Sequence, residues 1–243
     1  MEFDDDARLD TSQIDDARGR GGAGPDLGGL PGGFGTGAKL GGGGLIGLVV
    51  VIVIAFRSTR GGGFATNDML EPSTTVGDQS ATEVARECRT GADANERQDC
   101  RIVAVVNSVQ RYWSDTFARS GVAYRPARTQ LFSNRTYSGC GPASSATGPF
   151  YCPADETVYV DLTFFDALSQ PPFNAAGGPF AQAYVIGHEY GHHVQNLLGR
   201  SAGADRQGAT SGSVRIELQA DCYAGVWAAN AVSTGFVTEI TPE

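Results

Sequence analysis

Apolar residues recur at every third or fourth position between Asp99 and Ala118, which is the spacing of one face of an α-helix. These positions hold Ile102, Val106, Val109, Trp113 and Phe117. We therefore predict an amphipathic helix that packs against the core. A second helix is predicted between Pro179 and Gly199, because proline suits a first helical turn and glycine suits the position after the last turn. Its apolar stripe, which should also face the core, consists of Ile186, Tyr190, Val194 and Leu197.

Two stretches, 129–137 and 156–163, are predicted to be strands. In the second, apolar and polar residues alternate, as they do in a strand with one buried face and one polar face. The apolar set is Val158, Val160 and Leu162, and the polar set is Tyr159, Asp161 and Thr163. Helices and strands of this kind predict an α+β domain.

The pattern changes towards the N-terminus. Residues 1–39 are rich in Asp, Arg and Gly and poor in large apolar residues, so we expect them to be disordered. The stretch 40–56 has 17 residues without a charge, at the short end of the length that spans a bilayer. The apolar part of a signal peptide would lie nearer the N-terminus, and a buried core segment would lack glycine-rich flanks. We predict one transmembrane helix over 40–56, a polar linker over 57–80 and a folded domain over 81–243.

The formal net charge is −9, and no basic stripe runs along the chain. Binding to the phosphate backbone of nucleic acids is therefore disfavoured. The remaining residues after the N-terminal part, about 180, suffice for one domain with a sizeable core.

Four of the five cysteines form two close pairs, which predict the disulfides Cys88–Cys100 and Cys140–Cys152. Reduced, buried cysteines are the alternative, and the spacing does not suit a cysteine-based metal site. The remaining cysteine, Cys222, is expected to be a buried free thiol.

Disulfides place the folded domain outside the cytoplasm. We therefore predict a single-pass protein of the cell membrane with its N-terminus inside. The flanking charges, Lys39 before the stretch and Arg57 and Arg60 after it, weakly favour the opposite orientation.

All three histidines lie close together, at His188, His192 and His193, and the first two belong to an H-E-x-x-H sequence. Residues four apart share one face of a helix, so His188 and His192 can bind one Zn²⁺. Glu189 can then reach a zinc-bound water and act as general base. His193 falls beside the apolar stripe, and we interpret it as a packed neighbour rather than a ligand.

A catalytic zinc site usually has three protein ligands, and no histidine is left to supply the third. The candidate is Glu217, on a helix predicted over 214–227, with Asp221 one turn later on the same face. Asp221 can accept a hydrogen bond from the far nitrogen of a ligand histidine and orient its ring. An isolated E-x-x-x-D is no evidence for a metal site, because such a pair usually lies on a solvated helix face. Here apolar residues surround both motifs, which is not typical of a solvated face.

These motifs resemble the gluzincin type of zinc metallopeptidase, and more closely the bacterial neutral zinc metallopeptidase family. The resemblance covers roughly residues 40–232 and depends on Gly187 to Gln195, Glu217 to Cys222, and Gly148 to Asp155. It implies a zincin-like α+β fold with an active-site helix, a second ligand helix and a small antiparallel sheet behind one transmembrane helix. It also implies zinc, a membrane anchor and a peptide or protein substrate.

The expected activity is that of a membrane-anchored zinc-dependent endopeptidase. Weak candidates for stabilising the oxyanion are Tyr223, Tyr190 and Arg215. By analogy with zincins, the strand around Val158–Thr163 could bind substrate by strand addition. One departure concerns the end of the chain, since family members continue into further helical sequence with another histidine. The alternative prediction is therefore a catalytically inactive membrane-anchored scaffold protein that retains a zinc site.

Overall fold

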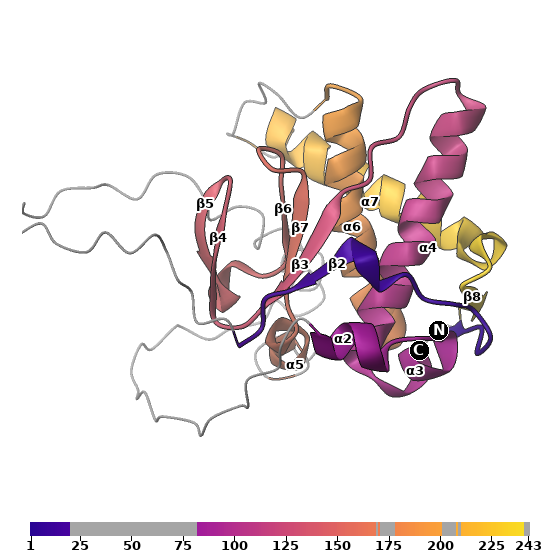
Figure 1. The fold of residues 1–243 in the computed structure, drawn as a ribbon. Helices are drawn as coiled ribbons and strands as arrows, with labels where there is room; N and C mark the ends of the chain where they lie inside the picture. The colour runs from indigo at the N-terminus through magenta and orange to yellow at the C-terminus, as the bar shows by residue number, and fades with distance from the viewer. Residues whose placement is uncertain (20–81, 169, 171–177, 201–207, 209, 241–243) are drawn as a thin grey trace, which may run out of the picture.

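The computed structural model describes residues 1–19, 82–168, 170, 178–200, 208 and 210–240 (Figure 1). Its helices are α2 (Thr82–Glu87), α3 (Gly91–Glu96), α4 (Gln98–Arg119), α5 (Thr163–Leu168), α6 (Pro179–Leu197) and α7 (Gly212–Asn230). Short 3₁₀ helices are η1 (Thr11–Gln13), η2 (Ser145–Thr147) and η3 (Ala231–Thr234). The strands are β1 (Glu2–Phe3), β2 (Ile14–Asp16), β3 (Arg128–Phe132), β4 (Arg135–Ser138), β5 (Gly141–Ser144), β6 (Phe150–Cys152), β7 (Thr157–Asp161) and β8 (Val237–Glu239).

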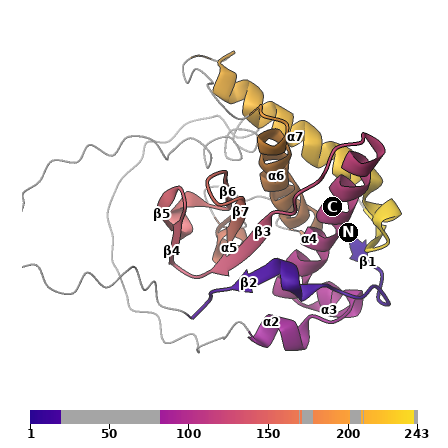
Figure 2. The ribbon, with the colours of Figure 1, turned by 45° about the horizontal axis from the view of Figure 1, so that its top comes forward.

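The main sheet has four strands in the order β2-β3-β7-β6. β2, β3 and β7 run parallel to one another, and only the edge strand β6 is antiparallel to its neighbour. The expectation of a small antiparallel sheet is therefore wrong for the main sheet, although β4 and β5 form a separate antiparallel pair. The fold is a mixed α/β arrangement in which α6 packs beside the sheet, and α4 and α7 pack against α6 (Figure 2).

Strand β7 is buried along its whole length, which corrects the prediction of one polar face. Tyr159 is 4% exposed and Asp161 is 1% exposed. The reason is that β7 lies between β3 and β6, and a second cluster of Phe132, Phe150, Cys152 and Tyr159 covers the face opposite the helices. The carboxylate of Asp161 accepts hydrogen bonds from the hydroxyl of Ser145 and from the backbone N–H of Asn134.

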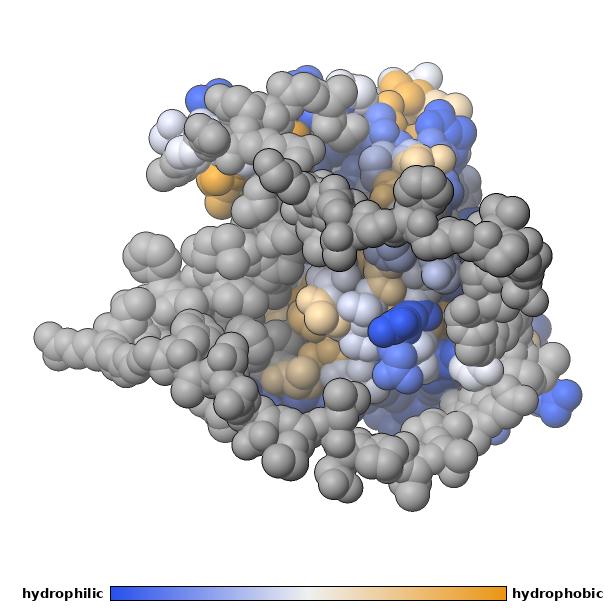
Figure 3. All heavy atoms as spheres, turned by 90° about the vertical axis from the view of Figure 1, so that its left-hand side faces the viewer, coloured by the Kyte–Doolittle hydropathy of each residue, from blue (hydrophilic) through white to orange (hydrophobic). Residues whose placement is uncertain are grey.

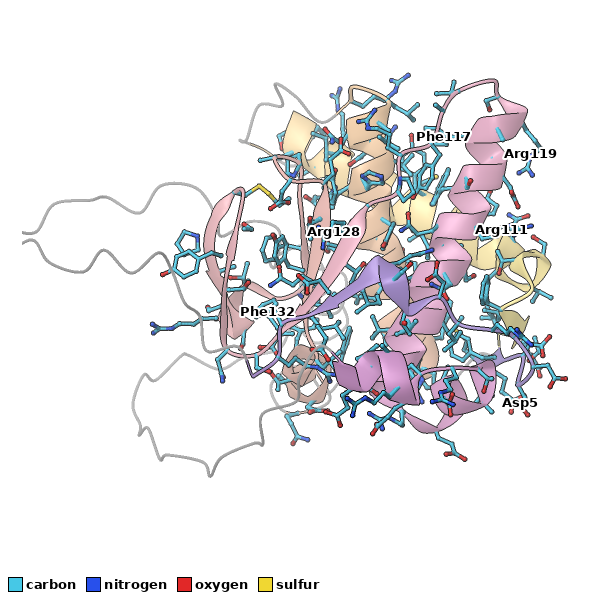
Figure 4. The ribbon with its side chains drawn as sticks, in the orientation of Figure 1. Asp5, Arg111, Phe117, Arg119, Arg128 and Phe132 are labelled. Carbon is cyan, nitrogen blue, oxygen red and sulfur yellow. A yellow bond between two sulfur atoms is a disulfide. The ribbon has the colours of Figure 1, made fainter. Side chains whose placement is uncertain are left out.

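The helix predicted around 99–118 is α4, and all five of its predicted core residues are buried. In Figure 4, Phe117 lies on the side of α4 that faces α6, whereas Arg111 and Arg119 lie on its outer side. On the β4–β5 side of the molecule, the described residues in view mix hydrophobic and hydrophilic groups (Figure 3).

Residues 1–19 are folded, so the prediction of disorder is wrong for this part of 1–39. β1 pairs with β8, and β2 extends the main sheet beside β3 (Figure 1). Composition misled here because backbone pairing and polar contacts hold much of the segment, and its buried apolar residues are few, namely Met1 at 7% and Phe3 at 3% exposure. The rest of that tail, the transmembrane stretch 40–56 and the linker 57–80 lie outside the described residues. Among the helices that the structure does describe, none has the length and hydropathy of a membrane span.

Both expected disulfides, Cys88–Cys100 and Cys140–Cys152, are present. Cys222 is exposed, which corrects the expectation of a buried thiol. It is not among the buried residues of α7, which are Glu217, Ala220, Ala224 and Trp227.

Candidate metal centre

Helix α6 carries the H-E-x-x-H sequence and follows the expected boundaries. Pro179 occupies its first turn, and Gly199 just after its end has a φ of 66°. Ile186, Tyr190 and Val194 are buried, as the predicted stripe requires. The opposite side of the helix is therefore left to face α7.

Helices α6 and α7 approach each other closely because α6 presents glycines to its neighbour. A Cβ atom on Gly191 would lie 2.7 Å from the backbone oxygen of Ala220, and one on Gly187 would lie 2.8 Å from the ring of Trp227. Only the absence of a side chain permits this contact. The spacing of Gly187 and Gly191, one turn apart, was a signal that sequence reasoning missed.

This contact brings the three predicted ligands together. His188 Nε2 lies 3.2 Å from Glu217 Oε2, and His192 Nε2 lies 3.3 Å from the same oxygen. One ligand atom from each of the three residues can be chosen so that all lie within 4.8 Å of one another. Two ligands that share a tetrahedral Zn²⁺ are about 3.3–3.4 Å apart, from the usual bond lengths.

Glu189 Oε2 is buried and makes no hydrogen bond in the described part of the chain. His192 Nε2 is also buried, and its 3.3 Å contact with Glu217 Oε2 does not have the geometry of a hydrogen bond. Buried polar atoms without a well-formed hydrogen bond are costly unless another group satisfies them. A zinc ion with its water would satisfy both. The donor set of two imidazoles and one carboxylate is also one that zinc prefers. These residues therefore fit the metal.

The charges at the site support this fit. Burial lowers the pKa of His188, but hydrogen bonds with Asp221 and Glu217 outweigh burial and raise that pKa to about 10. Burial raises the pKa of Glu217, but its contacts with His188 and His192 outweigh burial and lower that pKa to about 2. Protonated His188 therefore lies beside an ionised Glu217, and a divalent cation can take the place of that proton.

Each ligand histidine makes a hydrogen bond through Nδ1, the ring nitrogen that is not assigned to the metal. His188 Nδ1 lies 2.8 Å from Asp221 Oδ1, which is the contact expected of Asp221. His192 Nδ1 lies 2.9 Å from Gln195 Oε1, and Gln195 Nε2 donates to the backbone oxygen of Ile216 on α7. Gln195 is fully buried, so its amide links the ring of His192 to the second ligand helix. Gln195 belongs to the stretch on which the family resemblance depends, but the sequence did not reveal this role.

We expect Gln195→Leu to weaken zinc binding by about 10- to 100-fold, because partners that orient a ligand histidine have effects of this size. The measurement is competition for zinc with a chromogenic chelator. Leu218→Ala, at an exposed position next to Glu217, is the matched control and should bind zinc normally. Equal affinities for the wild-type protein and Gln195→Leu would contradict the role of the amide.

Glu189 lies on the side of α6 that faces strand β6. It is 1% exposed, and its carboxylate accepts the backbone N–H of Tyr151. Burial raises the pKa of Glu189. A carboxyl group whose pKa is raised in this way has greater affinity for a proton than an exposed one.

His193 is not part of the ligand set. Its Nε2 donates to the backbone oxygen of Arg125 at 2.7 Å, and its Nδ1 lies 3.0 Å from the hydroxyl of Tyr151. Asn196 donates to the same hydroxyl. This buried network fastens β6 to α6, next to Glu189.

Comparison with known proteins gives a direct match. The family described as "Putative neutral zinc metallopeptidase" matches residues 3–241. The chain belongs to this family. "Uncharacterized protein Rv2575" of Mycobacterium tuberculosis is 54% identical over 144 residues, which cover 58% of this chain and 47% of that protein. "Uncharacterized protein YpfJ" of Escherichia coli K12 is 37% identical over 230 residues, or 90% of this chain and 72% of that protein. No solved structure matches.

The chain thus spans about half the length of its mycobacterial relatives in this metallopeptidase family. The match covers both ligand helices and also β1, β2 and the sheet.

The three candidates for an oxyanion donor do not point at the ligands. The hydroxyl of Tyr190 lies 2.8 Å from that of Thr129, on the core side of α6. Tyr223 packs against the ring of Trp113 on α4, and Arg215 is exposed. Helical position explains the error, since none of the three shares a face with the ligand on its own helix.

The strand predicted to bind substrate is also corrected. β7 has a paired strand on each side, so its backbone has no free edge. The sheet edge nearest α6 is β6, which includes Tyr151.

Proposed function

We propose that this chain is a zinc-dependent endopeptidase with His188, His192 and Glu217 as its zinc ligands. The observation that carries the proposal is the convergence of these three side chains beside a buried Glu189 whose Oε2 has no partner among the described residues. A structural zinc site has no need of such a carboxylate, whereas hydrolysis needs a base there. Membership of the metallopeptidase family supports the same reaction class.

Bound zinc would supply a Lewis acid for the peptide carbonyl and make water acidic enough to lose a proton near neutral pH. Glu189 accepts that proton as the water attacks the carbonyl, and then donates it to the leaving amine. The N–H of Tyr151 fixes the carboxylate during both steps. Asp221 and Gln195 keep the two imidazoles oriented.

Strand β6 is the part of the chain best placed to hold the substrate. It is an edge strand next to α6, so an extended peptide can pair with its free edge. A peptide bound there would lie alongside Glu189, whose carboxylate contacts the β6 backbone at Tyr151.

His188→Ala should lose both zinc and turnover, because it removes one of three ligands and leaves Asp221 without its partner. We expect close to one zinc per wild-type chain, and little in the variant, by metal analysis after dialysis. Cys222→Ala, exposed and adjacent to Asp221, is the control and should keep its zinc. Normal zinc content in His188→Ala would contradict the ligand assignment. Zinc without peptide turnover in the wild type would favour the alternative of an inactive scaffold protein. That alternative is supported by the finding that none of the three candidate oxyanion donors points at the ligands.

We also propose that the domain works outside the cytoplasm, in contact with a membrane through the stretch 40–56. The two disulfides support an oxidising compartment. Its substrates would be peptides or proteins in that compartment, and its net charge of −9 does not favour nucleic acid.

A further inference from the structure

The first 19 residues, named here the N-terminal strap, form one folded unit with residues 82–240. The strap adds β2 to the sheet beside β3, and it pairs β1 with β8 at the other end of the sequence. Phe3 lies in the main hydrophobic core. The strap therefore contacts elements far apart along the chain and is not confined to one local patch (Figure 2).

Two asparagines of the helical region each accept one hydrogen bond from the strap backbone and donate one to it. Asn95 accepts from the N–H of Phe3 at 2.9 Å and donates to its carbonyl at 3.0 Å. Asn107 accepts from the N–H of Asp10 at 2.7 Å and donates to its carbonyl at 3.0 Å. Asn107 is 3% exposed, so its amide depends on the strap for these partners. In Figure 4 the labelled Asp5 lies beside α3, where it accepts from Asn95.

The end of the strap is fixed by an ion pair at the start of α4. The guanidinium of Arg18 lies 2.7 Å from Asp16 and 3.2 Å from Asp99. Asp99 is 7% exposed, and it also binds Arg97. Removing Arg18 would take away one of the two cations that compensate this buried carboxylate, which is costly.

These contacts are incompatible with one membrane crossing between the strap and α2. The apolar stretch 40–56 has 17 residues, enough for about one crossing and far too few for two. One crossing would put the strap and residues 82–240 on opposite sides of the bilayer, where none of the pairs above could form.

We propose that the strap and residues 82–240 occupy the same compartment, so that the chain between them crosses the membrane an even number of times, zero included. This inference is independent of the proposed peptidase activity, since it depends only on contacts of the strap.

Cysteine labelling of the full-length chain in spheroplasts tests the proposal. Cys222→Ala removes the exposed free thiol, and Glu2→Cys or Val122→Cys then adds one exposed thiol to the strap or to the main part of the domain. A membrane-impermeant maleimide is applied before and after the membrane is opened. We expect both positions to label under the same condition. Labelling of one before opening and of the other only afterwards would overturn the proposal.

The same experiment separates this inference from the location proposed above. Labelling of both positions before opening agrees with both proposals. Labelling of both only after opening supports a shared compartment and contradicts a location outside the cytoplasm.

A second measurement tests docking of the strap: Phe3→Ala should lower the midpoint of thermal unfolding by several degrees, whereas exposed Glu2→Ala should not change it. An unchanged midpoint for Phe3→Ala would mean that the strap is not part of the fold.

Discussion

Glu189→Gln is expected to abolish most peptide hydrolysis while the protein keeps its zinc. The amide has nearly the same shape as the carboxylate and can still accept the N–H of Tyr151. It cannot take a proton from water, and positioned general bases contribute about 100- to 10,000-fold to rate. We therefore expect kcat to fall by at least about 100-fold. Glu189 is not among the three ligands, so zinc content should match that of the wild type.

The measurement is turnover of an internally quenched peptide, together with metal analysis of the same samples. His188→Ala is the contrasting variant, because it should lose both quantities rather than one. Wild-type turnover in Glu189→Gln would rule out its role as the base. Loss of zinc in that variant would instead place Glu189 in the metal site itself.

Gly191→Ala is expected to destabilise the domain and to weaken zinc binding together. The added Cβ would meet backbone atoms of Ala220 at 2.7 and 2.9 Å, and backbone cannot rotate away as a flexible side chain can. Overpacking of this kind costs about 1–3 kcal/mol of unfolding free energy. Because α6 carries both histidines and α7 carries Glu217, moving the helices apart also separates the ligands.

Gly225→Ala is the matched control on α7, since a Cβ there has no neighbour within 4 Å. It should stabilise the protein by about 0.5–1 kcal/mol, the usual gain of alanine over glycine within a helix. Urea unfolding of both variants separates this helix propensity from the packing effect. Equal stability changes in the two variants would show that the α6–α7 contact at Gly191 can relax without cost.

The ligand set could be predicted from sequence because its information is local. Spacing of four residues places His188 and His192 on one helical face, and the same holds for Glu217 and Asp221. The boundaries of α6 and the burial of α4 followed from equally local patterns of apolar residues. Gln195 was harder to interpret, since its role depends on the carbonyl of Ile216 in a different helix.

Features that depend on neighbours distant in sequence were not predicted. The alternation in β7 resembles that of a half-exposed strand, but a cluster formed with Phe132 of β3 and Phe150 of β6 covers the face expected to be polar. The strap looks disordered by composition, yet β3, β8 and two asparagines supply the partners that its own sequence lacks. The polarity of a segment does not reveal such partners, because backbone pairing is largely independent of side-chain type.

The pairing of β1 with β8 also makes the domain a candidate for circular permutation. Glu2 lies opposite Glu239, so the beginning and end of the described chain are neighbours, as Figure 1 shows. A permuted gene could start at Thr82, run to Ile240, and continue through a short linker into residues 1–19. Such a chain would retain every strand pair described above and both ligand helices, and it would omit residues 20–81 with their apolar stretch. The zinc and turnover measurements could then be made on the described part of the chain alone.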